Sequence, residues 1–515
     1  MSFLLAAELP FTAPSFDFHA FAPEIILVGV LTVALLVDIF VDDAGAIVAS
    51  LTSWGFLGAL VPLVTLAWTD HGADVFGNGA YMVDNYALVL KALFLISGYL
   101  VTLLSMNYIG EGDYWEGEYY LLLIASVLGM TIMASARDLI GMFIALETLS
   151  IPAYMLAAWR KRDLKSDEAG MKYYLMGVFA SAVMLYGMSL LYGITGSTLL
   201  SDIALAIGQG ATSPAIVTLA IVFVLIGFAF KVSAVPFHQW APDTYEGAPT
   251  PVTAFLAVAS KAAGFVALLT LIYACFMYRS DVFQPLLWGI AAATMFVGNF
   301  IALRQTNLVR MLAYSGIAQA GYMLAPLAVV GLQSSAYELT LPAIVTYLII
   351  YMIMNLGAFG VVIAVARKTR SAEVDSFGGL FTYAPGLTVA MTIFLFSLAG
   401  IPPLAGWYAK FEIFRALVSA ESASGYVMAV LVGVNSVIAL AYYARVARAM
   451  WMEPVPDGDV TPIKVPPAIR SAIVLTAVAT LVLGIYPSAV GHFSESTGTC
   501  LSASAAQTVG TATGC

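Results

Sequence analysis

Almost the whole chain between Pro23 and Pro487 consists of apolar runs of about 20 residues, each long enough to cross the hydrocarbon core of a bilayer as a helix. Hydrophobic residues make up 61% of the 515 residues and charged residues only 10%, whereas a soluble domain carries about 25% charge. A helix satisfies its own backbone hydrogen bonds, which lipid cannot do. The sequence therefore predicts an all-α, polytopic membrane protein with about 14 transmembrane helices in one bundle.

Two of the predicted helices, 213–246 and 384–418, are too long for one straight span. The first contains Pro236 and the second contains Pro402 and Pro403. A proline inside a helix removes a backbone hydrogen bond and clashes with the preceding turn. Because a broken helix is tolerated at membrane depth only where it lines a cavity or is buried in protein, both segments are candidate parts of an internal pathway.

A weak internal repeat relates the two breaks. The segment YMLA at 154–157 recurs at 322–325, an offset of 168, and the Pro…Trp stretch at 236–240 recurs at 402–407, an offset of 166 to 167. The interval holds about five predicted helices, and an odd number of spans inverts the second copy, as in ion-coupled transporters. The predicted parts are N-terminal helices at 1–117, a first repeat at 118–277, an inverted repeat at 278–453, and a last helix with a flexible Ser/Thr/Ala/Gly-rich tail at 454–515.

Basic residues in the predicted loops lie mostly on one side of the bundle. Because cytoplasmic loops are enriched in Lys and Arg, that side is predicted to be cytoplasmic, and an even number of helices then places both termini on the periplasmic side. Residues 1–9 lack the positively charged start of a secretory signal. The basic residues on the cytoplasmic side are Arg160, Lys161, Arg162, Lys165, Arg304, Arg310, Arg367, Lys368, Arg370, Lys464 and Arg470.

Composition argues against several other classes of protein. The formal net charge of −10 comes mostly from acidic loops such as Asp42-Asp43, and no basic patch suits a nucleic-acid backbone. The three cysteines, Cys275, Cys500 and Cys515, and the four histidines form no metal-type cluster such as CxxC. We therefore expect no redox cofactor and no metal site in this chain. Cys500 and Cys515 would lie outside the cytoplasm, where a disulfide between them is possible.

Five lysines lie inside apolar runs, where an ionisable side chain costs at least about 2.5–3.5 kcal/mol. They are Lys91, Lys172, Lys231, Lys261 and Lys410. Such residues usually face a polar cavity or a partner and mark an ion or proton path. Lys231 lies next to the first break and Lys410 next to the second, at equivalent places in the two copies of the predicted repeat. The alternative of a purely structural charge applies to Lys231 and Lys261, and most of all to Lys91, which lies outside the repeat.

Two further titratable residues, Glu147 and His238, are candidates for the same path. Glu147 lies in the middle of an apolar predicted helix, and Lys172 on the next helix is the nearest candidate partner. The alternatives are that Lys172 extends to the cytoplasmic surface and that Glu147 merely hydrogen-bonds another helix. The imidazole of His238, inside the first break, titrates near neutral pH and suits a proton relay, although it could equally be a packed histidine. Most of the 26 tyrosines are predicted to pack or to lie at the membrane interface.

Three stretches carry a resemblance to one family of membrane proteins. They are Phe230–Gly264 (FKVSAVPFHQWAPDTYEGAPTPVTAFLAVASKAAG), Ala145–Leu156 (ALETLSIPAYML) and Gly400–Phe411 (GIPPLAGWYAKF). Together they resemble subunit N of the proton-pumping NADH–quinone oxidoreductase, respiratory complex I, over nearly the whole chain. The related M- and L-type subunits and the Mrp antiporter subunits share the Lys…Pro…His…Trp frame. They typically read LPDAMEGPTPVSA where this chain reads APDTYEGAPTPVTA, and the M-type subunit usually has a glutamate at the position of Lys410.

The resemblance implies roles in proton translocation. Glu147 resembles the essential glutamate of the fifth helix, Lys172 its partner on the sixth helix, and Lys231 the broken-helix lysine that holds the transported proton. The remaining positions, which join the two half-channels and form the exit, are His238, Lys261 and Lys410.

The resemblance also implies which reactions and cofactors belong to partner subunits. NADH oxidation and quinone reduction, with FMN and iron–sulfur clusters, are expected in partner subunits, and K-type and M-type membrane subunits are expected as neighbours in a bacterial inner membrane. Three alternatives stay open: an Mrp-type cation/proton antiporter subunit, the equivalent subunit of a ferredoxin-, plastoquinone- or hydrogenase-linked complex, and a non-pumping scaffold.

Overall fold

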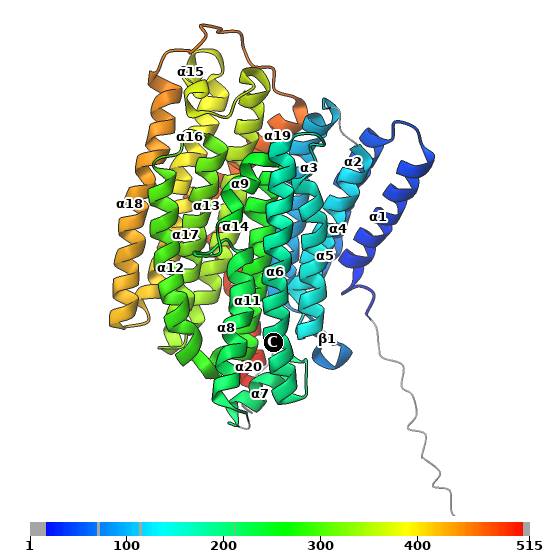
Figure 1. The fold of residues 1–515 in the computed structure, drawn as a ribbon, viewed down its shortest axis with the longest axis vertical. Coiled ribbons are helices and arrows are strands. Elements are labelled where there is room, and N and C mark those ends of the chain that lie inside the picture. Colours follow the sequence, from blue (N-terminus) through cyan, green and yellow to red (C-terminus); the bar gives the residue numbers. More distant parts are fainter. Residues whose placement is uncertain (1–16, 70–72, 113–115, 211, 508–515) are drawn as a thin grey trace, which may run out of the picture.

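Helices make up almost the whole of the computed structural model, which describes residues 17–69, 73–112, 116–210 and 212–507, the last ten of these by their backbone alone. They form one bundle, elongated along the helix direction (Figure 1). The helices are α1 Ala22–Phe40, α2 Gly45–Trp68, α3 Asn85–Gly110, α4 Glu116–Ser135, α5 Leu139–Ala157, α6 Leu164–Thr195, α7 Leu200–Gly208, α8 Pro214–Lys231, α9 Trp240–Gly247, α10 Thr250–Phe255, α11 Lys261–Leu271, α12 Ser280–Ala302, α13 Leu308–Leu324, α14 Ser334–Thr369, α15 Leu380–Tyr383, α16 Pro385–Ala399, α17 Ala405–Val418, α18 Ala423–Met452, α19 Pro467–Ile485 and α20 Ser488–Gln507.

The predicted class is confirmed, because eleven helical stretches in the described part of the chain are long and apolar enough to cross a membrane. The number of about 14 spans stays a prediction. The innermost helices, α3, α11 and α14, are almost entirely buried by their neighbours, whereas α1 and α18 lie at opposite edges of the bundle (Figure 1). Large apolar side chains on the outer helices, such as Trp54, Phe179 and Val437, are exposed. On a membrane protein such side chains face hydrocarbon. They therefore avoid the unfavourable free energy that apolar surface has in contact with water.

Both predicted breaks are present. The first lies between the end of α8 at Lys231 and the start of α9 at Trp240, and the second lies between α16 and α17. A break leaves backbone groups without helical partners, so other groups must satisfy them. At the first break the indole Nε1 of Trp240 donates to the carbonyl of Phe230 at 3.1 Å, and Thr294 on α12 accepts from the backbone N–H of Val235 at 3.0 Å. The four-part division with an inverted second repeat stays a prediction.

The described part of the segment after Pro487, which ends at Gln507, differs from its predicted flexibility. Residues Ser488–Gln507 form α20, which packs against α14 and α3. Ser494 is buried, and its hydroxyl accepts a hydrogen bond from Thr346 on α14 at 2.8 Å. The prediction of flexibility rested on the many small residues of this segment, and small residues also permit close contact between membrane helices. Cys515 and the side chain of Cys500 lie outside the described residues, so the predicted disulfide stays a prediction.

Candidate functional site: a row of buried lysines

Lys231 ends α8 at the first break, and its side chain points into the bundle. It is 4% exposed, and its Nζ donates to Ser150 Oγ at 2.8 Å and to the Tyr173 hydroxyl at 3.4 Å. Ser150 and Glu147 are three residues apart on α5, so they share one face of that helix. The face of α5 that carries Ser150 and Glu147 is therefore turned towards Lys231. The structure thus brings Glu147 to Lys231.

Lys172 lies elsewhere, and its predicted pairing with Glu147 is absent from this structure. Its Nζ is 2.6 Å from Glu168 Oε1 and 2.7 Å from Asp243 Oδ2, and its side chain is 40% exposed. Oε1 of Glu147 is buried with no hydrogen-bond partner among the described residues. The physical reason is that α9 folds back after the break and offers Asp243 to Lys172. The alternative in which Lys172 extends towards the surface describes its position better.

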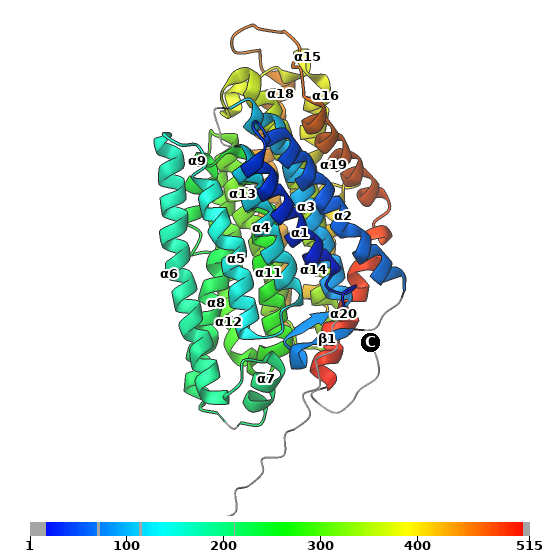
Figure 2. The same cartoon turned by 90° about the vertical axis from the view of Figure 1, so that its right-hand side faces the viewer.

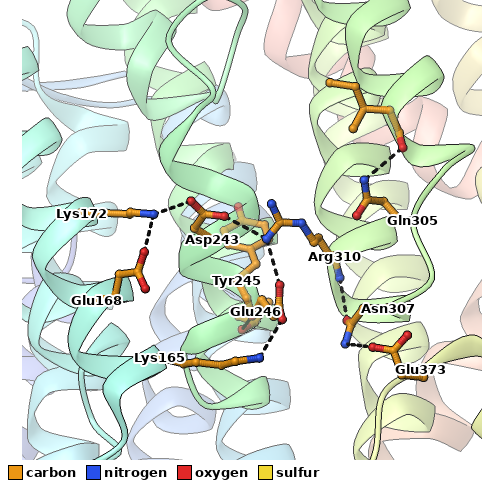
Figure 3. Close-up of polar contacts among 12 residues, drawn as sticks. Lys165, Glu168, Lys172, Asp243, Tyr245, Glu246, Gln305, Asn307, Arg310 and Glu373 are labelled. Carbon is orange, nitrogen blue, oxygen red and sulfur yellow. Dashed lines mark hydrogen bonds and ion pairs between the residues drawn. The ribbon is translucent and has the colours of Figure 1, made fainter.

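Six charged residues from three helices form what we call the bridging cluster: Lys165, Glu168, Lys172, Asp243, Glu246 and Arg310 (Figure 3). Arg310 on α13 donates to Asp243 and to Glu246, both on α9, at 2.9 Å each, and Lys165 on α6 is 3.1 Å from Glu246. Lys165 and Arg310 lie in the first turns of their helices, so the cluster lies at one end of the bundle. It connects α6 of the predicted first repeat to α13 of the second through the fragment after the break.

Two of the three carboxylates of the bridging cluster, Asp243 and Glu246, belong to α9, which is not one of the spanning helices. Burial disfavours their charged forms. The hydrogen bonds from Lys172 and Arg310 to Asp243, and from Arg310 and Lys165 to Glu246, outweigh that cost and hold the pKa of both carboxyl groups below the ordinary value. Sequence reasoning missed Asp243 and Glu246, although their spacing of three residues inside the PDTYEG segment places both on one face of a helix.

Removing the Asp243 carboxylate should weaken the bridging cluster without unfolding the chain. These side chains are about a third exposed, so each ion pair contributes below about 1 kcal/mol. In a double-mutant cycle of Asp243→Asn with Lys172→Gln, we expect a coupling of about 0.5 kcal/mol in thermal unfolding of the purified protein, decreasing as salt rises. If the stability losses of Asp243→Asn and Lys172→Gln simply added up in the double variant at low salt, this result would contradict the direct pairing seen in Figure 3.

Lys261 is the second lysine of the row and is 1% exposed. It begins α11, directly after a π-helical stretch at Leu256–Ser260, and such stretches are frequent at functional sites. Its Nζ donates to the backbone carbonyl of Gly316 on α13 at 2.7 Å. The aliphatic part of Lys231 packs against Gly264, one turn along α11 from Lys261, so the first two lysines contact the same helix.

Gly316 admits the Lys261 ammonium because it has no side chain. A Cβ at this position would lie 3.2 Å from Lys261 Nζ and 2.9 Å from the Tyr351 hydroxyl. We expect Gly316→Ala to displace Lys261 and to reduce proton transfer through the chain about 10- to 100-fold, since a shift of about 1 Å can have that effect. The measurement is proton uptake by vesicles containing the assembled complex. The control is Gly289→Ala on α12, where nothing lies within 4 Å of the added methyl group; an equal loss there would contradict the local effect.

Buried polar side chains fill the space between Lys261 and the second break. On α13, Ser315 hydrogen-bonds the hydroxyl of Tyr443, and Gln319 accepts from the hydroxyl of Tyr347 on α14. Gln319 Nε2 also donates to the Leu398 carbonyl at 3.2 Å and to the Tyr443 hydroxyl at 3.3 Å. Hydroxyl groups that both donate and accept can pass a proton along such a chain.

Sequence reasoning missed this polar chain because it assigned most tyrosines to packing. The spacing of polar residues along two helices would have indicated it. Tyr347, Tyr351 and Asn355 follow one another every fourth residue along α14, and Ser315 and Gln319 do so on α13. All five are nearly or fully buried. A polar stripe on an otherwise apolar spanning helix indicates an internal pathway.

Lys410 on α17 is the third lysine and lies at the second break. Its Nζ donates at 2.8 Å to the carbonyl of Ala399, the last residue of α16, and lies 4.9 Å from the centre of the Tyr322 ring. The last carbonyls of a helix have no helical partner and carry partial negative charge, so they stabilise an ammonium group. Glu412, two residues further along α17, pairs with Arg415 at 3.1 Å.

His238 lies in the first break, as predicted, but the structure joins it to neither neighbouring lysine by a hydrogen bond. Its Nδ1 is buried without a hydrogen-bond partner among the described residues. The relay role of His238 therefore stays a prediction.

Lys91 is part of a separate buried group near the strands β1 (Asp74–Phe76) and β2 (Tyr81–Val83), which pair antiparallel with Val75 opposite Met82. Its Nζ lies 3.0 Å from Glu24 Oε1 on α1 and 3.1 Å from the Tyr81 hydroxyl. This geometry fits the structural alternative, because the ion pair connects α1 to α3.

Within the described residues no group of three or more His, Cys, Asp or Glu side chains could hold a metal ion. The candidate site is made up of three buried lysines, one glutamate and the polar groups that connect them.

Two broken helices, each with a buried lysine, and a third lysine between them define an antiporter-type membrane subunit. The matching family model is described as "NADH:quinone oxidoreductase/Mrp antiporter, TM" and covers residues 136–439. A chain of respiratory complex I from Thermus thermophilus has the same fold, with a TM-score of 0.75, 32% identity, and coverage of 91% of this chain and 98% of that chain. A chain of the Mrp complex from Dietzia sp. shares the fold alone, with a TM-score of 0.82 and 19% identity over 95% of this chain and 98% of that chain.

Sequence identity shows which family of antiporter-type subunits this chain belongs to. The NADH-quinone oxidoreductase subunit N of Desulfitobacterium hafniense is 42% identical over 85% of this chain and 89% of that protein. The subunit N of Trichlorobacter lovleyi is 40% identical over 93% of this chain and 96% of that protein. The chain belongs to the NADH-quinone oxidoreductase subunit N family.

Proposed function

We propose that this chain is the N-type membrane-arm subunit of a proton-translocating NADH–quinone oxidoreductase and carries protons across a bacterial inner membrane. Both termini lie on the periplasmic side, and K-type and M-type subunits are its neighbours. Oxidation of NADH and reduction of quinone take place in partner subunits with FMN and iron–sulfur clusters. This chain contributes only the movement of protons.

The observation that carries the proposal is the row of buried lysines. From Glu147 the row runs through Lys231, Lys261 and Lys410, and polar side chains occupy the space between the last two. A charged lysine is expensive inside a membrane protein, so each ammonium group depends on its few polar neighbours. A change in those neighbours therefore moves a proton on or off the lysine.

The geometry supports a specific order of events. When Glu147 lies close, its negative charge stabilises the ammonium form of Lys231, and the lysine holds a proton. If Glu147 is drawn away, Lys231 releases its proton towards Lys261, and the chain of Gln319, Tyr443 and Tyr347 passes it to Lys410. Lys172 acts from the bridging cluster, whose Asp243 belongs to the same broken helix as Lys231.

The test is a mild purification of the chain from native membranes, followed by an assay of NADH oxidation with a quinone acceptor. We expect flavin, iron–sulfur signals and NADH–quinone activity to accompany the chain. Copurification with membrane subunits alone, without redox activity but with Na⁺/H⁺ exchange in vesicles, would contradict the proposal and indicate an Mrp-type antiporter. Redox activity with ferredoxin or hydrogen in place of NADH would indicate one of the related complexes.

A further inference from the structure

An apolar groove with a volume of about 540 Å³ opens on the outer surface between α16 and α19. Its walls include Pro385, Ala390 and Ile393 on α16 and Ile473, Ala477 and Leu481 on α19. Ligand pockets commonly have volumes of about 300–1,000 Å³, so the groove is large enough for a chain-like ligand. The two helices lie next to each other along one edge of the bundle (Figure 2).

The groove faces the surroundings of the bundle. α19 is among the least buried of the spanning helices, and Val389, Val474 and Val478, which line the groove, are 44%, 52% and 53% exposed. Side chains of this kind on an outer helix contact acyl chains wherever no neighbouring subunit covers them. An acyl chain is therefore the occupant that suits the exposed apolar wall.

One end of the groove is basic. Arg470, in the second turn of α19, is exposed and is the only charged residue of the groove wall. Lys464 is exposed between Ile463 and Val465, which both line the groove. In the described part of the chain neither Arg470 nor Lys464 forms an ion pair, whereas nearby Lys368 is neutralised by Asp459 at 3.2 Å. The N-terminus of α19, at Pro467, adds partial positive charge to the same end.

We propose that this α16–α19 groove binds an anionic phospholipid, with an acyl chain along the apolar wall and the phosphate group against Arg470 and Lys464. Two observations carry the assignment: an apolar groove open to the bilayer, and two unpaired cations at one end of it. Basic pockets between transmembrane helices are typical sites for anionic headgroups. The basic end lies on the side that the loop charges predict to be cytoplasmic, where anionic lipid headgroups are available.

The proposal predicts a preference for charge as well as for the acyl chain. The assembled complex containing this chain is reconstituted in phosphatidylcholine vesicles with a small share of phosphatidylglycerol that carries a diazirine in its acyl chain. After illumination, labelled peptides are identified by mass spectrometry. We expect labelling on α16 and α19, reduced about fivefold by Arg470→Gln and about 30-fold by Arg470→Gln with Lys464→Gln, since each basic residue near the surface contributes about that factor.

Two further variants separate the acyl contact from the charge contact. Ala477→Trp fills the apolar wall, keeps both cations and should also abolish labelling. Arg448→Gln removes a cation that is 72% exposed on α18 and should leave labelling unchanged. All of these positions lie outside the lysine row, so NADH–quinone turnover provides the check that the complex is assembled.

Three results would overturn the proposal. Equal labelling by a diazirine phosphatidylcholine would show ordinary lipid contact without headgroup recognition. Labelling that survives Arg470→Gln with Lys464→Gln in an active complex would show that the cations do not bind the phosphate. Crosslinking of a photoreactive residue at position 477 to a neighbouring subunit instead of lipid would show that protein covers the groove.

Discussion

Replacing Lys231 by methionine should lower proton transfer through this chain at least about 100-fold, the lower range of what a positioned proton-transfer group contributes. Methionine keeps most of the length and the unbranched shape of the side chain but removes the ammonium group. Ser150 and Tyr173 then lose their shared donor, and Glu147 loses the positive charge that it faces. The measurement is acidification of vesicles containing the assembled complex during NADH oxidation, with quinone reduction recorded in parallel.

The controls distinguish chemistry from assembly. Lys231→Arg keeps the charge and should retain part of the proton transfer, and Lys161→Met removes an exposed lysine and should have no effect on it. If Lys231→Met and Glu147→Gln both leave turnover and pumping intact in assembled complexes, the chain is a non-pumping scaffold and the proposed role is wrong.

Arg137→Met should cause the largest loss of stability, about 3–5 kcal/mol, because it leaves the buried carboxylate of Asp84 without its partner. Arg137 Nη2 lies 3.1 Å from Asp84 Oδ2, and the two side chains are 6% and 0% exposed. Arg137 also donates to the carbonyls of Ala134 and Ala136 at 3.1 Å each. The measurement is the thermal unfolding midpoint of the purified chain in detergent.

A second substitution tests the cause of that loss. Asp84 caps α3 by accepting from the N–H of Ala87 at 2.8 Å, and asparagine can also serve as a cap. Arg137→Met combined with Asp84→Asn should therefore recover more than half of the lost stability, since no buried charge remains. Arg448→Met, at an exposed position, is the control and should change stability by less than about 0.5 kcal/mol. A double variant no more stable than Arg137→Met would show that the arginine acts through its carbonyl contacts instead.

The three lysines of the row could be predicted, and their partners could not. Lys231, Lys261 and Lys410 can be recognised in the sequence because a charge inside an apolar run is rare, however the helices pack. Their acceptors, Ser150, Gly316 and Ala399, are ordinary residues in the sequence. Ser150 and Gly316 are separated from their lysines by 81 and 55 positions, so only the packing of distant helices selects them.

Lys172 illustrates the limit of arguments from neighbouring helices. Its place on the helix after Glu147 favours a pair between adjacent helices, yet its partner Asp243 lies 71 positions further along the chain. The break after Lys231 turns α9 back towards α6, and no local preference encodes where that fragment comes to rest. Arg310, 67 positions beyond Asp243, completes the bridging cluster in the same way.

From the sequence one can infer the membrane class, the helical architecture, the two breaks and the positions of the buried charges. Each of these follows from a local free energy: the transfer of an apolar run into lipid, the lost hydrogen bond at a proline, and the cost of burying an ion. The groups that face those ions, from the polar stripe of α14 to the carbonyl of Ala399, become visible only in the folded bundle. Such contacts depend on the relative rotation and depth of helices far apart in the chain, and the same packing converts the small residues of α20 from a predicted tail into part of the bundle.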